Sequence, residues 1–126
     1  MNYIIGSKNI TFSNGCSLSL EYPIQKALVV NNVIIILIEP PFEVIYNENV
    51  FAFTVAGDFL WRLGKVKLFY QGQDKCPYVG MEINKQTELV LYNWCDTGVV
   101  VNPQSGDVIR IYQTKWSVVS ALLILS

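Results

Sequence analysis

The stretch Asn49–Leu63 contains two runs of hydrophobic residues with a turn-like break between them. Ala56-Gly57-Asp58 interrupts the first run, and large residues then return at every second position from Phe59 onward. Two such runs around a glycine-containing break are typical of a β-hairpin. The alternation places Phe59, Trp61 and Leu63 on one face of the second strand, so we expect Trp61 to lie in the core.

The same arrangement occurs again at Gly98–Tyr112, where residues 102–107 separate an apolar run from Val108–Tyr112. Both breaks contain a Gly-Asp step, with Asp58 in the first and Asp107 in the second. Aspartate at a hairpin tip commonly hydrogen-bonds to nearby backbone. We therefore interpret both aspartates as turn formers and not as ligands.

Shorter alternating stretches fill most of the remaining chain and divide one predicted domain, 1–126, into four parts. These are N-terminal strands in 1–22, a first meander in 24–70, a second meander in 78–113 and a C-terminal strand in 116–125. Asn14-Gly15 and Asn31-Asn32 separate pairs of runs by two residues that tolerate positive φ, as hairpin turns require.

Residue types and periodicity favour an all-β fold. Branched and aromatic residues dominate, and no capped segment repeats with a helical period. We predict an antiparallel β-meander with two blade-like four-stranded units, propeller-like or arranged as a barrel or sandwich, without significant helix. Ile34–Ile38 is apolar on both faces, which predicts a strand that is covered on both sides or docked on a partner.

The composition limits the kinds of partner that the chain is expected to bind. The chain has 126 residues with 52% hydrophobic and 15% charged residues, and the charged share is low for a globular domain. This balance indicates extensive burial or a surface that meets a partner. The formal net charge of −1 includes no block of like charges, so we expect no nucleic-acid binding.

Cys16, Cys76 and Cys95 are odd in number and have no CxxC spacing, so we expect reduced, buried thiols and neither a disulfide framework nor a metal site. The N-terminus lacks the pattern of a secretory signal, which predicts a cytoplasmic location. The apolar C-terminal stretch is shorter than a bilayer-spanning helix, so no membrane association is expected.

Residues 78–113 resemble one blade of a β-propeller of the pyrroloquinoline-quinone-like repeat type, in which a strand ends, a turn carries a Gly-Asp step and the next strand starts with an apolar residue. Residues 47–63 look like the inner part of another such blade. Similar segments occur in small uncharacterised bacterial proteins that pair two meanders. A closed propeller needs at least four blades of about 40–50 residues, so this chain cannot close one, and the quinone site of such a ring is excluded.

The chain contains no histidine, which removes the commonest general base and the commonest metal ligand. We therefore predict no enzymatic activity, no catalytic residues, no cofactor and no metal. Glu39, Glu43 and Glu48 could form an acid-base pair, but solvated loop glutamates are the simpler interpretation. A reactive Cys95 would need a neighbouring cation or base, and the sequence supplies none.

Tryptophan and tyrosine are enriched at binding hot spots and can stack on sugars. Most aromatic residues here should belong to the core. Those that flank turns and the polar loop at 71–77 are the candidates for an exposed interaction surface. The candidate surface consists of Tyr70, Tyr78, Trp94 and Asp96.

Two hypotheses about function follow. The first is a non-catalytic protein-interaction or self-associating domain, for example a small immunity-type protein that neutralises a toxin partner. The second is a small-molecule or carbohydrate-binding module that uses exposed aromatic residues. The second hypothesis requires a concave pocket lined by Trp or Tyr with a few converging polar groups, and fails if all three tryptophans are buried and no such pocket exists.

Overall fold

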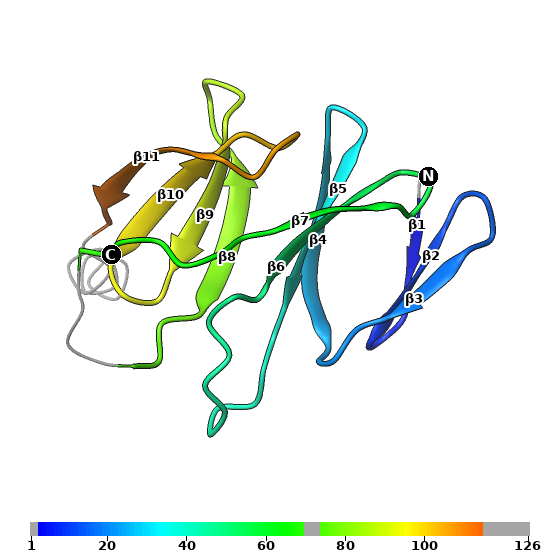
Figure 1. Ribbon diagram of the computed structural model, residues 1–126, viewed down its shortest axis with the longest axis horizontal. Helices are drawn as coiled ribbons and strands as arrows, with labels where there is room; N and C mark the ends of the chain where they lie inside the picture. The colour runs from blue at the N-terminus through cyan, green and yellow to red at the C-terminus, as the bar shows by residue number, and fades with distance from the viewer. Residues whose placement is uncertain (1–2, 70–73, 115–126) are drawn as a thin grey trace, which may run out of the picture.

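A computed structural model describes residues 3–69 and 74–114 of the chain. These residues form eleven β-strands in three antiparallel sheets and contain no helix (Figure 1). The all-β prediction is therefore confirmed. The sheets stay separate and do not close into a barrel among the described residues. The strand predicted at 116–125 lies outside the described residues.

The N-terminal sheet has three strands in the order β1-β2-β3. The strands are β1 (Tyr3–Ile5), β2 (Asn9–Phe12) and β3 (Ser17–Ser19). It lies at the blue end of the molecule in Figure 1. Gly15 in the turn between β2 and β3 has a φ of 89°, as expected from the Asn-Gly pair.

The central sheet has four strands in the order β4-β5-β6-β7, joined as a simple meander. The strands are β4 (Ile24–Val30), β5 (Val33–Ile38), β6 (Val50–Thr54) and β7 (Phe59–Arg62). Both residues of the β4–β5 turn, Asn31 and Asn32, have positive φ. This turn is the two-residue hairpin that the sequence predicts.

The C-terminal sheet repeats this plan with the order β11-β10-β9-β8. The strands are β8 (Tyr78–Ile83), β9 (Leu89–Asn93), β10 (Thr97–Val101) and β11 (Val108–Gln113). The two predicted four-stranded units are thus present as two separate sheets.

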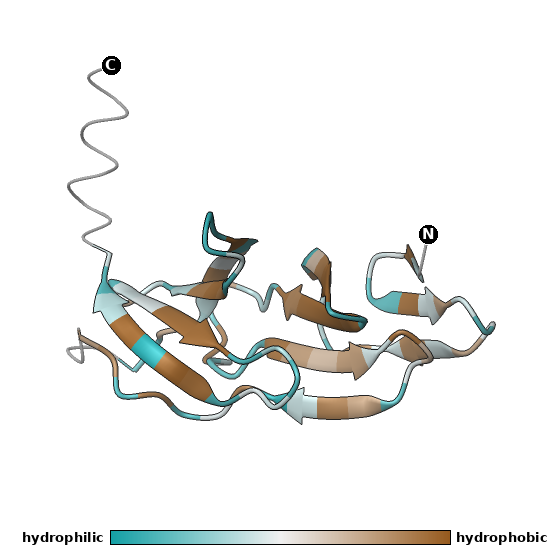
Figure 2. Ribbon diagram, turned by 90° about the horizontal axis from the view of Figure 1, so that it is seen from above, coloured by the Kyte–Doolittle hydropathy of each residue, from teal (hydrophilic) through white to brown (hydrophobic). Residues whose placement is uncertain are grey.

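The central sheet is a middle layer. Every residue of β5 is buried, and alternate side chains enter two different hydrophobic clusters. Ile34, Ile36 and Ile38 pack with Ile10 and Phe12 of the N-terminal sheet. The prediction that this strand is covered on both sides is confirmed. Figure 2 shows hydrophobic residues along the strands and polar residues mostly in the connecting loops.

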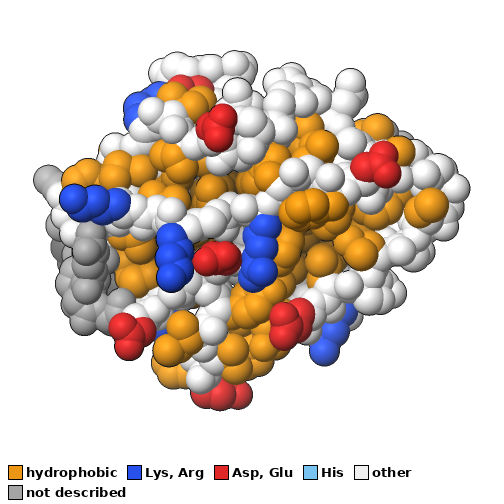
Figure 3. Space-filling view, viewed as in Figure 1, with side chains coloured by type: hydrophobic (Ala, Val, Ile, Leu, Met, Phe, Trp, Pro, Cys, Tyr) orange, Lys and Arg blue, Asp and Glu red, His pale blue; other side chains and the backbone are white. Residues whose placement is uncertain are grey.

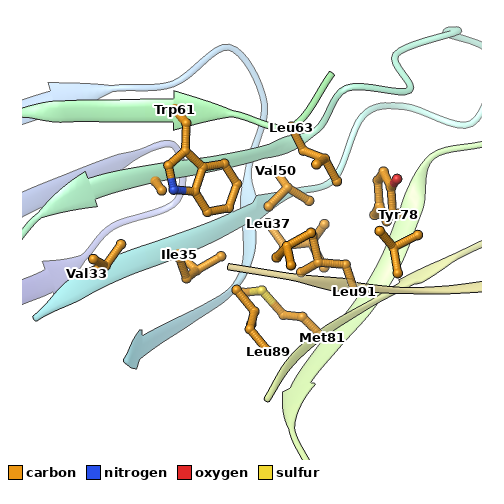
Figure 4. Close-up of a cluster of buried hydrophobic side chains, with 13 residues drawn as sticks. Val33, Ile35, Leu37, Val50, Trp61, Leu63, Tyr78, Met81, Leu89 and Leu91 are labelled. Atoms are coloured by element: carbon orange, nitrogen blue, oxygen red, sulfur yellow. The ribbon is translucent and has the colours of Figure 1, made fainter. Parts of the chain in front are cut away.

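The larger cluster joins the central and C-terminal sheets. The side chains of β5 that face away from the N-terminal sheet meet those of β8, β9 and β10 (Figure 4). Burying one large aliphatic side chain stabilises a fold by about 1.5–3 kcal/mol, so this interface is a main source of stability. Its members are Val33, Ile35, Leu37, Val50, Ala52, Trp61, Leu63, Tyr78, Met81, Leu89, Leu91, Val99 and Val101.

Each four-stranded sheet contains the same β-bulge in its last hairpin. Leu60 in β7 and Ile109 in β11 are each left without an opposite residue, three positions after the glycine of the turn. The bulge at Leu60 puts Phe59 and Trp61 on opposite faces, because an extra residue reverses the alternation. The prediction that Phe59 shares the face of Trp61 is wrong: Phe59 is exposed and contacts Phe53.

The glycines of the two repeated turns, Gly57 and Gly106, each lie against an aromatic ring of the preceding sheet. Gly57 and Gly106 have φ of 96° and 77°. A Cβ atom at Gly57 would lie 2.7 Å from the Phe12 ring, and one at Gly106 would lie 2.6 Å from the Trp61 ring. Trp61 also donates a hydrogen bond from Nε1 to the Pro103 carbonyl oxygen at 2.8 Å. The repeated turn therefore serves to interlock adjacent sheets.

Both aspartates that follow these glycines lie in the turns, as predicted. The Asp58 amide donates to Oγ1 of Thr54 at 3.0 Å, and the Asp107 amide donates to Oγ of Ser105 at 3.2 Å. Such local bonds fix turn geometry.

Candidate functional site

Strand β8 begins beside β4, and a second pair of equivalent bulges marks this junction. Gln25 in β4 and Val79 in β8 are each left unpaired in the register. Gln25 Nε2 donates to the Val79 carbonyl oxygen at 3.1 Å, and Lys26 Nζ donates to the Met81 carbonyl oxygen at 2.9 Å. Bulges reorient side chains and are common beside functional sites. Here both bulged residues line one groove.

Asn49 holds the start of β8 against the central sheet. It is 0% exposed, and its Nδ2 donates to the carbonyl oxygens of Ile38 and Tyr78 at 2.9 and 2.8 Å. Its Oδ1 accepts from the Tyr78 amide at 2.9 Å. A buried amide side chain that meets all these partners is strongly position-specific.

Two further asparagines fix the segment just before β8. Asn47 Nδ2 donates to the Asp74 carbonyl oxygen at 2.7 Å, and Asn47 Oδ1 accepts from the Cys76 amide at 2.8 Å. Asn93 Nδ2 donates to the Cys76 carbonyl oxygen at 2.8 Å. The bonded residues are thus every second one, as along a strand. The residues between them, Lys75 and Pro77, line the groove on the other side.

A disulfide joins Cys76 to Cys95, which corrects the prediction of reduced thiols. The Cα atoms are 5.4 Å apart, within the usual range for a disulfide. The two cysteines are 19 residues apart in sequence, and only the pairing of β8 with β9 brings them together. The third cysteine, Cys16, is exposed beside a turn and was also predicted to be buried.

Trp94 begins the three-residue turn between β9 and β10. The Asn93 Oδ1 atom accepts from the Cys95 amide, and the Trp94 amide donates to the Pro77 carbonyl oxygen at 2.9 Å. Asp96 occupies the position with φ of 56°. The disulfide and these bonds leave the Trp94 side chain 59% exposed at the groove.

The loop between β5 and β6 forms another side of this groove. The Val44 amide donates to the Pro41 carbonyl oxygen at 3.0 Å, which closes a tight turn with Phe42 in it. Phe42 is 89% exposed, an unusual position for a phenylalanine in a folded domain. Figure 1 shows this loop, the lead into β8 and the β9–β10 turn at the same end of the molecule.

These segments enclose what we call the aromatic groove, a cavity of about 510 Å³. Its volume is within the range of small-ligand pockets. Most of its lining is apolar or aromatic. It is lined by Gln25, Glu39, Pro40, Phe42, Lys75, Pro77, Tyr78, Val79 and Trp94.

A second cavity of about 620 Å³ lies beside the first, and Tyr78 lines both. Its lining includes Arg62, Lys65, Glu48 and Asp74, so its charges have mixed sign. Figure 3 likewise shows acidic and basic side chains interspersed with hydrophobic ones on one face of the molecule. This mixture gives no single-sign field of the kind that steers polyanions.

The four predicted surface residues have different outcomes. Trp94 is exposed and lines the groove. Tyr78 is 4% exposed and belongs to the core, because β8 packs on β5; its burial raises the pKa of its hydroxyl. Asp96 is half-buried, shapes the turn and does not line the groove. Tyr70 lies outside the described residues.

Sequence reasoning missed Phe42 and the three asparagines. Pro40-Pro41 next to an aromatic residue is a signal for an exposed aromatic, since prolines cannot continue a ladder. The predicted carboxylates do not converge: Glu39 lines the groove, Glu48 the second cavity, and Glu43 neither.

The described residues provide neither a metal-ligand cluster nor a membrane-spanning helix. They contain no group of three or more acidic, cysteine or histidine side chains that could hold a metal. They also contain no helix with the length and hydrophobicity needed to span a bilayer.

The chain matches one family model but no curated protein and no solved structure. A family model described as "Domain of unknown function (DUF7957)" matches residues 1–112, which include the aromatic groove and nearly all of the three sheets. The chain therefore belongs to the DUF7957 family.

Proposed function

We propose that this protein is a non-catalytic protein-binding domain and that the aromatic groove is its binding surface. The observation that carries the proposal is the pair of exposed aromatic side chains, Phe42 and Trp94, at one concave site. Exposed aromatics in a groove are the typical anchors of an interface. The lack of histidine supports a binding role over a catalytic one.

The surroundings of the groove favour binding because they are ordered in advance. Asn49, Asn93 and the disulfide fix the segments that carry Lys75, Pro77 and Trp94. A site ordered before binding loses less conformational entropy when a partner arrives.

The proposal has two forms, in which the partner is the toxin of a toxin-immunity pair or a second copy of this chain. The predicted cytoplasmic location also stays a prediction. The Cys76–Cys95 disulfide argues for an oxidising compartment, because cytosolic thiols are normally kept reduced. The resemblance to quinone-type propeller repeats stays a prediction as well.

A carbohydrate- or small-molecule-binding module is the second candidate. The exposed Trp94 at a concave site favours it, since an exposed tryptophan face can stack on a sugar ring. This hypothesis requires a concave pocket lined by Trp or Tyr, and Trp94 and Tyr78 both line the aromatic groove.

The test compares the wild type with the double variant Phe42→Ala/Trp94→Ala. Affinity capture from the native host followed by mass spectrometry should recover a protein with the wild type and lose it with the double variant. Phe59→Ala, an exposed phenylalanine outside the groove, is the matched control and should retain capture.

Light scattering at several concentrations separates self-association from binding to another protein. A wild type that is strictly monomeric and captures nothing contradicts the proposal. Binding to a glycan array that the double variant lacks would favour the second candidate instead.

A further inference from the structure

Resting on the proposed function, we propose that the groove recognises a protein segment that presents a carboxylate next to an apolar side chain. Lys75 binds the carboxylate, and the ring of Phe42 is the cover that the segment displaces. The inference rests on the surroundings of Lys75, which the proposed function does not require.

The Lys75 ammonium group is buried and has no hydrogen-bond partner among the described residues. A buried cation without an acceptor is unfavourable, and proteins usually provide one. The only ion pair among the described residues joins Arg110 to Glu88, so neither Glu39 nor Asp74 forms an ion pair with Lys75. A ligand carboxylate would supply the missing acceptor.

The Phe42 ring lies over this cation. The Lys75 Nζ atom lies 4.0 Å from the centroid of the ring. The ring is otherwise exposed and sits in the Pro41–Val44 turn. A cation–π contact is weaker than a charge-assisted hydrogen bond to a carboxylate. Exchanging the first for the second gives the ammonium a stronger partner, and it frees the Phe42 ring to contact the ligand.

The rest of the groove defines the neighbouring side chain of the ligand. Pro40, Pro77, Val79 and Trp94 form an apolar surface beside Lys75. Glu39 is the other charged residue of the lining and disfavours a second carboxylate. A neutral sugar would leave the ammonium without a charged partner, and a single lysine is too little charge for a nucleic acid.

A phage-displayed library of random heptapeptides, selected on the immobilised full chain, tests the inference. Peptides enriched by the wild type should combine Asp or Glu with an adjacent apolar residue. Lys75→Met keeps the length and apolar stem of the side chain but removes its charge. Synthetic copies of the enriched peptides should bind this variant about tenfold to a hundredfold more weakly by calorimetry.

Lys65→Met is the matched control, because Lys65 lines the second cavity and its loss should leave affinity unchanged. Enriched peptides without an acidic residue, or with equal affinity for Lys75→Met, overturn the inference while the proposed function stands. No enrichment over the Phe42→Ala/Trp94→Ala variant also overturns the inference, whereas the proposed function fails only if the wild type is monomeric and captures no protein. Thermal melts of each variant confirm that it is folded.

Discussion

The central and C-terminal sheets share strand order and the positions of both bulges, yet one is a middle layer and the other an end layer. The central sheet is covered on both faces by other sheets. The outer face of the C-terminal sheet has no described sheet against it. The difference shows that a repeated backbone plan does not determine how a sheet is covered. The side chains on each face of the sheet determine what packs against it.

Side chains of the end layer contact one another on its outer face. Val90 and Val100, which are opposite each other in β9 and β10, are buried. The Tyr112 ring lies over Gly98, and the Tyr92 hydroxyl donates to Glu82 at 2.8 Å. Burial, with Tyr112 and Glu82 nearby, raises the pKa of Tyr92.

The largest expected effect is at the contact between the two sheets. Trp61→Ala removes a side chain that is only 7% exposed together with its hydrogen bond to Pro103. We expect a loss of about 3–5 kcal/mol in the free energy of unfolding, measured by denaturant titration. Trp94→Ala is the control and should change stability little. An unchanged stability in Trp61→Ala would mean that the sheets do not depend on this interlock.

The next effect concerns the disulfide, which has no counterpart in the middle layer among the described residues. Cys76→Ser/Cys95→Ser should lower the free energy of unfolding by about 3 kcal/mol, because the unfolded chain regains the freedom of the 19-residue loop. Peptide affinity should also fall, since the loss loosens Lys75 and Trp94. Reduction of the wild type should reproduce both changes; if it leaves both unaltered, the bond has no structural role.

A smaller effect tests the contact between the Tyr112 ring and Gly98. A Cβ at Gly98 would lie 2.5 Å from the Tyr112 ring, so Gly98→Ala should displace the ring and cost about 1–2 kcal/mol. Gly80→Ala is matched to it, because its nearest contact would be an ordinary 3.9 Å. Thermal melts should therefore distinguish the two variants. Equal melting temperatures would argue against a covering role for Tyr112.

The smallest effect is a dependence on pH at the same face. Hydrogen bonds from Arg110, at 2.6 and 2.8 Å, and from Asn84 lower the pKa of Glu88 from 4.5 to about 2. Because the folded pKa is lowered, the contribution is fully present above pH 4.5 and is lost as the pH falls through 2. The pair is exposed, so the contribution is small. Unfolding curves of wild type and Glu88→Gln should converge across this window; a constant difference would contradict it.

Much of the fold could be predicted from local pattern. The strand positions, the hairpins at Asn31-Asn32 and Gly57, the buried β5 and the core position of Trp61 all follow from alternation and turn residues. These properties depend on neighbours within a few residues. Phe59 could not be placed, because a single unpaired residue at Leu60 reverses the faces.

The candidate site was predicted less well. Trp94 was found because it flanks a turn, but Tyr78 was placed on the surface and Phe42 was missed. Flanking a turn does not decide exposure when another sheet packs over the turn, as β5 packs over Tyr78. The roles of Asn47, Asn49 and Asn93 depend on partners that are up to 29 residues away.

By itself, the sequence determined an all-β chain of repeated meanders, because strand alternation and turn chemistry act over short distances. Only the tertiary structure decided which sheets cover the two faces of β5, that Cys76 meets Cys95, and that Phe42, Lys75 and Trp94 share a groove. These facts require segments that are distant in sequence to pack together, and packing depends on the shapes of whole sheets rather than on any local pattern.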